Sequence, residues 1–129
     1  MVIDDQQDAL DALSTLLTCM QAQAFSFRSG REALQWMRRR GARRCVDVVL
    51  CDIAMPVEDG YDTLASIRAL EKECGVGADE SLRVIALTAF AQLEDQERAL
   101  RAGFAMHIAK PVAAEELADA VSQIGNATP

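Results

Sequence analysis

The chain has 129 residues, of which 50% are hydrophobic and 26% are charged. This length and composition fit one folded domain with its own core and exclude an intrinsically disordered chain. The formal net charge of -7 argues against nucleic acid or an anionic membrane as a direct partner. We recognise no signal peptide, and no apolar run approaches the roughly 20 residues of a membrane-spanning helix, so we expect a cytoplasmic protein.

The cysteines and the one basic cluster do not indicate a separate site. The cysteines lack the spacing of zinc ligands, and we expect buried, reduced side chains at Cys19, Cys45, Cys51 and Cys74. The basic cluster around Gly41 consists of Arg38, Arg39, Arg40, Arg43 and Arg44. We interpret it as a solvated helix end, where arginine suits the helix dipole, rather than as a phosphate or nucleic-acid site. We expect Trp36 and Met37 to take part in helix packing.

Short apolar runs alternate with helical repeats five times along the chain. The apolar runs predict strands at residues 1–3, 24–27, 46–51, 83–87 and 106–108. Apolar residues at helical spacing predict helices at residues 6–22, 30–40, 61–73, 93–102 and 114–124. We expect Ser29 to cap the second helix and residues 75–79 to form a loop.

This alternation predicts a doubly wound α/β fold with a five-stranded parallel sheet and helices on both faces. The carboxyl ends of parallel strands meet at one edge of the sheet. Four of the five predicted strands end in, or just before, a polar or charged residue that can act at such an edge. These residues are Asp4 and Asp5 after the first strand, Asp52, Thr88 and Lys110.

Three neighbouring carboxylates repel one another unless a cation lies between them. Oxygen ligands without cysteine or a suitable histidine favour a hard ion, and an open site favours Mg²⁺ over Ca²⁺. Lys110 adds a positive charge and Thr88 adds a hydroxyl donor. Because phosphoryl transfer depends on positioning and charge neutralisation, and aspartate can form an acyl phosphate, the pattern favours phosphoryl transfer to Asp52.

Five short motifs occur in a fixed order and are the basis of a resemblance. They are Val2-Ile3-Asp4-Asp5, Asp52-Ile53-Ala54-Met55-Pro56 with Asp59-Gly60, Ala86-Leu87-Thr88-Ala89, Ala102-Gly103-Phe104 and Lys110-Pro111. Through them the chain resembles the receiver domain of two-component response regulators. The resemblance covers residues 1–124 and leaves 125–129 as a tail or linker end. It implies a flavodoxin-like sheet with strand order 2-1-3-4-5.

The resemblance implies a role for each residue of the acidic site. Asp52 would accept a phosphoryl group from a phosphohistidine of a sensor histidine kinase or a phosphotransfer domain. Asp5 would bind Mg²⁺ directly, Asp4 mainly through water, and Ala54 through its backbone carbonyl. The domain would catalyse its own phosphorylation and slow dephosphorylation without being a conventional enzyme.

Further roles concern the last two strands. Thr88 and Lys110 would contact the phosphoryl oxygens, and Pro111 would follow a cis peptide bond. His107 stands where the family usually has an aromatic switch residue, and it would swing inward as Thr88 moves onto the phosphate. Phosphorylation-dependent dimerisation is an additional expectation.

The context most resembles receivers at the carboxyl end of hybrid sensor histidine kinases. A first strand of three residues and the lack of a following output module favour a receiver that belongs to a longer protein. Phe90 stands two residues beyond Thr88, where the family often has a polar or acidic residue. We hypothesise that this apolar side chain slows loss of the phosphoryl group.

Several alternatives remain open at this point. Asp4 could cap the first helix, Thr88 could be an ordinary strand-end hydroxyl, and His107 could be a packed histidine at the edge of the core. The whole domain could be a binding-only pseudo-receiver that mediates protein contacts without phosphorylation. A small Mg²⁺-dependent phosphatase is disfavoured, because Ala54 stands where a general acid would be needed.

Overall fold

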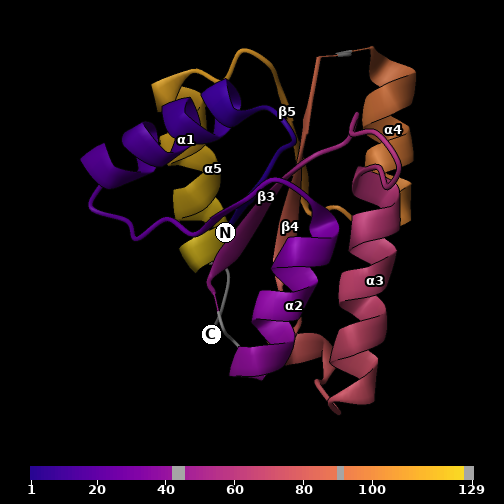
Figure 1. Cartoon of the computed structure of the whole chain (residues 1–129). Coiled ribbons are helices and arrows are strands. Elements are labelled where there is room, and N and C mark those ends of the chain that lie inside the picture. Colours follow the sequence, from indigo (N-terminus) through magenta and orange to yellow (C-terminus); the bar gives the residue numbers. More distant parts are fainter. Residues whose placement is uncertain (42–45, 90–91, 127–129) are drawn as a thin grey trace.

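A computed structural model describes residues 1–41, 46–89 and 92–126. Its five strands are β1 Val2–Ile3, β2 Ser26–Phe27, β3 Val48–Asp52, β4 Arg83–Thr88 and β5 Met106–Ala109. They form one parallel sheet in the order β2-β1-β3-β4-β5 (Figure 1). Both the predicted α/β class and the strand order are confirmed.

The helices cover both faces of the sheet. They are α1 Gln7–Cys19, α2 Gly30–Arg40, α3 Gly60–Glu73, α4 Leu93–Ala102 and α5 Ala114–Asn126. Helices α1 and α5 lie on one face, and α2, α3 and α4 lie on the other (Figure 1). No described helix has the length and the apolar character needed to cross a bilayer.

Each face of the sheet has its own hydrophobic core, and β3 contributes to both. Val49 and Cys51 belong to the core under α2 and α3, whereas Leu50 belongs to the core under α1 and α5. All three side chains are at most 1% exposed. A strand buried on both faces has no solvated side, which explains its continuous apolar sequence. Its last residue, Asp52, therefore carries a charge to the end of an otherwise apolar strand.

Several predicted boundaries differ from those observed. Helix α1 ends at Cys19 rather than at residue 22, because Gln21 adopts a left-handed backbone with φ 63°. The amides of Gln21 and Ala22 then bond the carbonyls of Thr18 and Leu17, which is a Schellman termination. Strand β3 begins at Val48, two residues later than predicted.

Other elements refine the predicted outline. The predicted loop after α3 runs into a short 3-10 helix, η1, at Ala78–Glu80. Helix α5 continues two residues beyond the predicted end of the domain, to Asn126, and residues 127–129 lie outside the described part. Ser29 caps α2 as predicted, since its hydroxyl accepts a 3.2 Å hydrogen bond from the Glu32 amide.

The prediction of buried cysteines was wrong for two of the three described ones. Cys51 is buried in β3, but Cys19 and Cys74 are exposed because each lies at a helix end. Cys45 lies outside the described residues, as do Arg43 and Arg44 of the basic cluster.

Side-chain packing around the end of α2 fits the predicted helix end. The Arg38 side chain pairs with Glu73 at 3.3 Å, and the Arg40 guanidinium lies 4.8 Å from the Trp36 ring centre. Trp36 packs against Phe25 at a ring-centre distance of 4.9 Å, and Met37 is fully buried. Both residues therefore serve helix packing, as predicted.

Gly60 allows α3 to start directly against the end of β3. Its amide donates a 2.8 Å hydrogen bond to the carbonyl of Ile53. A Cβ atom at this position would lie 2.7 Å from both the Asp52 carbonyl oxygen and the Ile53 Cα. Only glycine permits this approach, so the Asp59-Gly60 pair fixes the helix close to Asp52.

We predict that Gly60→Ala destabilises the fold by more than about 1 kcal/mol, although alanine is the better helix former. The backbone next to Asp52 must move to admit the methyl group. Gly77→Ala is the matched control, because nothing lies within 4 Å of its Cβ position and its φ is an ordinary -77°. Urea denaturation gives both values. Equal effects of the two substitutions would contradict the close-approach argument.

Candidate functional site

The carboxyl edge of the sheet gathers the five residues that the sequence singled out. Asp4 and Asp5 follow β1, Asp52 ends β3, Thr88 ends β4, and Lys110 follows β5. The parallel register pairs Asp52 with Leu87 of β4 and Thr88 with Ala109 of β5. Since neighbouring strands end level with one another, residues up to 106 positions apart in sequence lie in direct contact.

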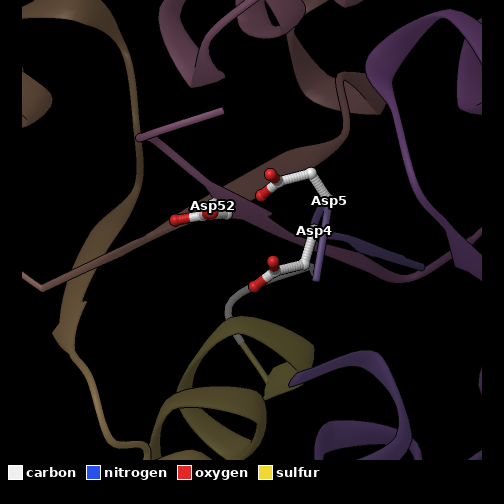
Figure 2. Close-up of side chains that lie close together, drawn as sticks. All are labelled: Asp4, Asp5 and Asp52. Carbon is white, nitrogen blue, oxygen red and sulfur yellow. The ribbon is translucent and has the colours of Figure 1, made fainter. Parts of the chain in front are cut away.

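The three carboxylates form a compact cluster. Each of Asp4, Asp5 and Asp52 offers one oxygen, and these oxygens all lie within 4.8 Å of one another. Figure 2 shows the three side chains converging from the ends of two adjacent strands. Asp4 is fully buried, Asp52 is 4% exposed and Asp5 is partly exposed. Oxygen ligands of this number, open to solvent on one side, fit a hard divalent cation such as Mg²⁺.

Lys110 lies between two of these acids. Its Nζ is 2.7 Å from Asp4 Oδ2 and 3.4 Å from Asp52 Oδ1, and its amide bonds the Thr88 carbonyl at 2.7 Å. Burial alone would lower the pKa of Lys110, but the hydrogen bond that Lys110 donates to Asp4 and the negative charges of Asp52 and Asp4 outweigh it and raise the pKa. The lysine is therefore a fixed positive charge. The bond from Lys110 to Pro111 is cis, as the resemblance implied.

Asp4 has a second partner at the start of α1. Its Oδ1 accepts a 3.0 Å hydrogen bond from the Gln6 amide, and Gln6 is the N-cap residue, with no capping bond from its own side chain. The helix-start role of Asp4 and its role in the acidic cluster therefore coexist, because each uses a different carboxylate oxygen.

The environment of Asp52 disfavours its charge. Burial and the charge of Asp4 raise the pKa of Asp52 to about 6, against the opposing effects of Lys110 and the Ala54 backbone hydrogen bond. A cation bound nearby would therefore stabilise the charged form of Asp52. Burial, followed by the charges of Asp52 and Asp4, raises the pKa of Cys51 to about 12. The Cys51 thiol stays protonated at neutral pH and is not a competing nucleophile.

Thr88 and His107 lie as the strand pattern predicted. Thr88 is 3% exposed at the end of β4, and His107 pairs with Ala86 in the middle of the β4–β5 ladder. The His107 side chain is partly buried, and its Nε2 is buried without a hydrogen-bond partner among the described residues. This position fits both a packed histidine at the edge of the core and a switch residue. Phe90 lies outside the described residues.

A hollow of about 480 Å³ adjoins the acidic cluster. Its lining consists of Ile53, Ala54, Met55, Asp59, Tyr61, Thr88, Asp95 and Arg98. It lies between the segment that follows β3 and the first turns of α4. The hollow thus reaches Ile53, which directly follows Asp52, and Thr88 at the same edge of the sheet.

Two basic residues near this edge were missed by sequence reasoning. The Arg98 guanidinium lies 4.4 Å from the Tyr61 ring centre, and Tyr61 packs edge-on against Phe104 at 5.6 Å. On the other side of the site, Arg28 donates a 3.4 Å hydrogen bond to the backbone carbonyl of Asp5. No motif or period marks either arginine, because each reaches the edge through tertiary packing.

The structure is thus a parallel α/β fold with an acidic cluster, a lysine and a threonine at the carboxyl edge of its sheet. Comparison with known protein families identifies the family of this domain. The pattern of the response regulator receiver domain matches residues 1–122, and the chain belongs to this family. It is a receiver domain of two-component signal transduction.

The relatives include small proteins and very long ones. An uncharacterized 14.6 kDa protein of Leptolyngbya boryana is 35% identical over 95% of this chain and 86% of its own length. Hybrid signal transduction histidine kinase D of Dictyostelium discoideum is 30% identical over 94% of this chain, which spans 8% of that kinase.

Among solved structures, the receiver domain of Ssk1 in complex with the Saccharomyces cerevisiae histidine phosphotransfer protein Ypd1 has a TM-score of 0.83. It is 22% identical and covers 97% of this chain and 86% of its own. At this identity the likeness concerns the fold.

The raised pKa of Asp52 predicts a pH-dependent stability difference between wild type and Asp52→Asn. As the pH rises from about 4 to about 6, the unfolded chain loses a proton that folded Asp52 retains. Wild type should therefore lose stability relative to the variant across this range, by on the order of 1–3 kcal/mol. Urea denaturation in the presence of a chelator measures the difference.

The exposed carboxylate Asp79 supplies the control substitution, Asp79→Asn. Its stability difference from wild type should stay nearly constant over the same range. A constant difference for Asp52→Asn as well would contradict the unfavourable environment of Asp52.

Proposed function

We propose that the domain is the phosphoacceptor switch of a two-component phosphorelay, with Asp52 as the acceptor. The observation that supports it best is the position of the Asp52 carboxylate, 3.4 Å from the Lys110 ammonium and within the cluster that includes Asp4 and Asp5. The Asp52 carboxylate thus has one positive side chain beside it and two further carboxylates that could hold a cation with it.

In the proposed reaction an Asp52 carboxylate oxygen attacks the phosphorus of a phosphohistidine. An O–P bond forms and the P–N bond breaks, and its electron pair returns to the imidazole. The ring, protonated at its other nitrogen, leaves as neutral histidine. Lys110 lies where it can bind a phosphoryl oxygen while it still contacts Asp4, and the Thr88 hydroxyl is a second donor at the same edge.

Asp4, Asp5 and Asp52, with the backbone carbonyl of Ala54, are the residues that would hold Mg²⁺. The bound ion would supply a divalent positive charge to neutralise the acids and the incoming phosphoryl oxygens. Three carboxylates and one lysine leave two negative charges uncompensated among these four side chains, which matches the charge of such an ion.

The proposed switch follows from the same edge. A phosphoryl group on Asp52 would draw the Thr88 hydroxyl toward it, and the vacated space would admit His107 from the adjacent strand. The altered face then comprises α4, β5 and α5. Phosphorylation-dependent dimerisation through that face is part of the proposal.

The biological setting is also a proposal. The donor is a sensor histidine kinase or a phosphotransfer domain, in line with the complex of Ypd1 and the Ssk1 receiver. The functional unit comprises residues 1–124 and acts in the cytoplasm without direct contact to nucleic acid or membrane. Because relatives include a hybrid histidine kinase that this chain spans only in part, we place the domain within such a protein.

A binding-only pseudo-receiver would be expected to have lost at least one residue of the phosphorylation site. All five residues that the chemistry needs are present and adjacent, namely Asp4, Asp5, Asp52, Thr88 and Lys110. The phosphatase alternative still lacks a general acid at Ala54. The acceptor switch is therefore the function that the site supports best.

Incubation with acetyl phosphate and Mg²⁺ should add about 80 Da to the protein, one phosphoryl group, as seen by mass spectrometry. Asp52→Asn should abolish the adduct, and Lys110→Met should slow its formation by about 100-fold. Lys72→Met, at an exposed lysine of α3, is the matched control and should react like wild type. No adduct on any variant would favour the pseudo-receiver, and steady release of phosphate from esters would favour the phosphatase.

Binding of Mg²⁺ should stabilise the folded state, since the ion binds the native cluster and not the unfolded chain. We expect millimolar Mg²⁺ to raise the urea midpoint of wild type at pH 7, and Asp5→Asn to remove most of that shift. Asp79→Asn should retain it. A shift of equal size in all three proteins would indicate a general salt effect and would contradict a site at Asp5.

A further inference from the structure

Val57 combines two unfavourable features at one position. Its backbone φ is 69°, in the left-handed region that β-branched residues rarely adopt. Its side chain is 103% exposed, more than any other large apolar side chain of the described residues; the others that are exposed are Leu93 and Leu100. Glycine would relieve both costs, because it adopts this backbone freely and exposes no apolar side chain.

The fold itself offers no reason for a valine here. The other described non-glycine residue with positive φ, Gln21, is polar and terminates α1. Val57 instead lies in a tight turn, where the Glu58 amide bonds the Pro56 carbonyl at 2.8 Å. Strained backbone of this kind tends to occur at functional sites, where it serves recognition or catalysis.

The location of Val57 in the fold indicates which function this strained backbone would serve. It lies five residues after Asp52, on the segment whose Met55 and Asp59 line the hollow beside the acidic cluster. Across the hollow, α4 begins with Leu93, which is 68% exposed. Because Asp52 is only 4% exposed, a protein that brings a phosphohistidine to it has to contact the segments around this edge of the sheet, and the segment that carries Val57 is one of them.

We propose that Val57 is an apolar anchor for a phosphohistidine-bearing protein, which covers it while the phosphoryl group passes to Asp52. This inference rests on the proposed function and names a docking contact for it. Burial of one exposed valine against the donor favours binding, and the turn holds the side chain clear of the domain's own core. A small phosphodonor has no surface to place on Val57 and does not depend on it.

The test compares two donors on four proteins. The proteins are wild type, Val57→Gly, Val57→Asn and the control Leu100→Ala, which removes a 54% exposed side chain from α4. Phosphoramidate with Mg²⁺ is the small donor, and phosphorylated Ypd1 is the protein donor. Glycine and asparagine both tolerate the left-handed backbone, so the variants should fold, and urea denaturation verifies this.

We expect transfer from Ypd1 to fall about tenfold in both Val57 variants, and labelling by phosphoramidate to stay within about twofold of wild type. Leu100→Ala should behave like wild type with both donors. Loss in the glycine variant but not in the asparagine variant would overturn the anchor, because loop order rather than apolar contact would then be responsible.

Other results overturn different claims. The anchor alone is overturned if Ypd1 transfers its phosphoryl group equally well to wild type and to both Val57 variants. It is also overturned if phosphoramidate labels wild type but Ypd1 transfers nothing to it. A wild type that phosphoramidate does not label overturns the proposed function itself.

Discussion

The ammonium group of Lys110 faces two buried carboxylates, Asp4 at 2.7 Å and Asp52 at 3.4 Å. One positive charge thus stands against two negative charges, and the rest of the site depends on this imbalance. A buried acid beside another acid is costly in the weakly screened interior. The lysine offsets part of that cost and is held in place by its backbone bond to Thr88. Burial and the charge of Asp4 still raise the pKa of Asp52 to about 6, so a further cation at this edge would stabilise the charged carboxylate.

The rest of the fold keeps this charged edge in place. Strand β3 is buried on both faces, so it brings Asp52 to the edge on a rigid support. Gly60 lets α3 begin against the Asp52 backbone, with no room for a side chain between them. Asp4 ties the start of α1 to Lys110 through its two oxygens. The domain therefore couples helix positions on both faces of the sheet to one cluster of charges.

That coupling gives the proposed switch its physical basis. A phosphoryl group would change the charge balance that Lys110 now satisfies, and Thr88 is joined to Lys110 by the backbone of the adjacent strand. On the other side of the hollow, Tyr61 contacts both Arg98 of α4 and Phe104, which precedes β5. Movement at the edge would thus reach α3, α4 and β5 through direct contacts rather than through the whole core.

The sequence by itself determined the alternation of strands and helices and the five residues of the edge. Hydrophobic period and strand-end position are local properties, and parallel strands must end on one side, so Asp52 and Lys110 could be brought together without coordinates. The strand order and the cis Pro111 came from the family resemblance.

Only the tertiary structure decided the features that depend on contacts between distant segments or on individual backbone angles. These are the early end of α1 at Gln21, the clearance at Gly60, the two partners of Asp4, the stacking of Arg98 and the left-handed backbone of Val57. None of them changes the hydrophobic period of the chain. The pattern of residues therefore predicted which groups meet, and packing decided how closely they meet and what each one contacts.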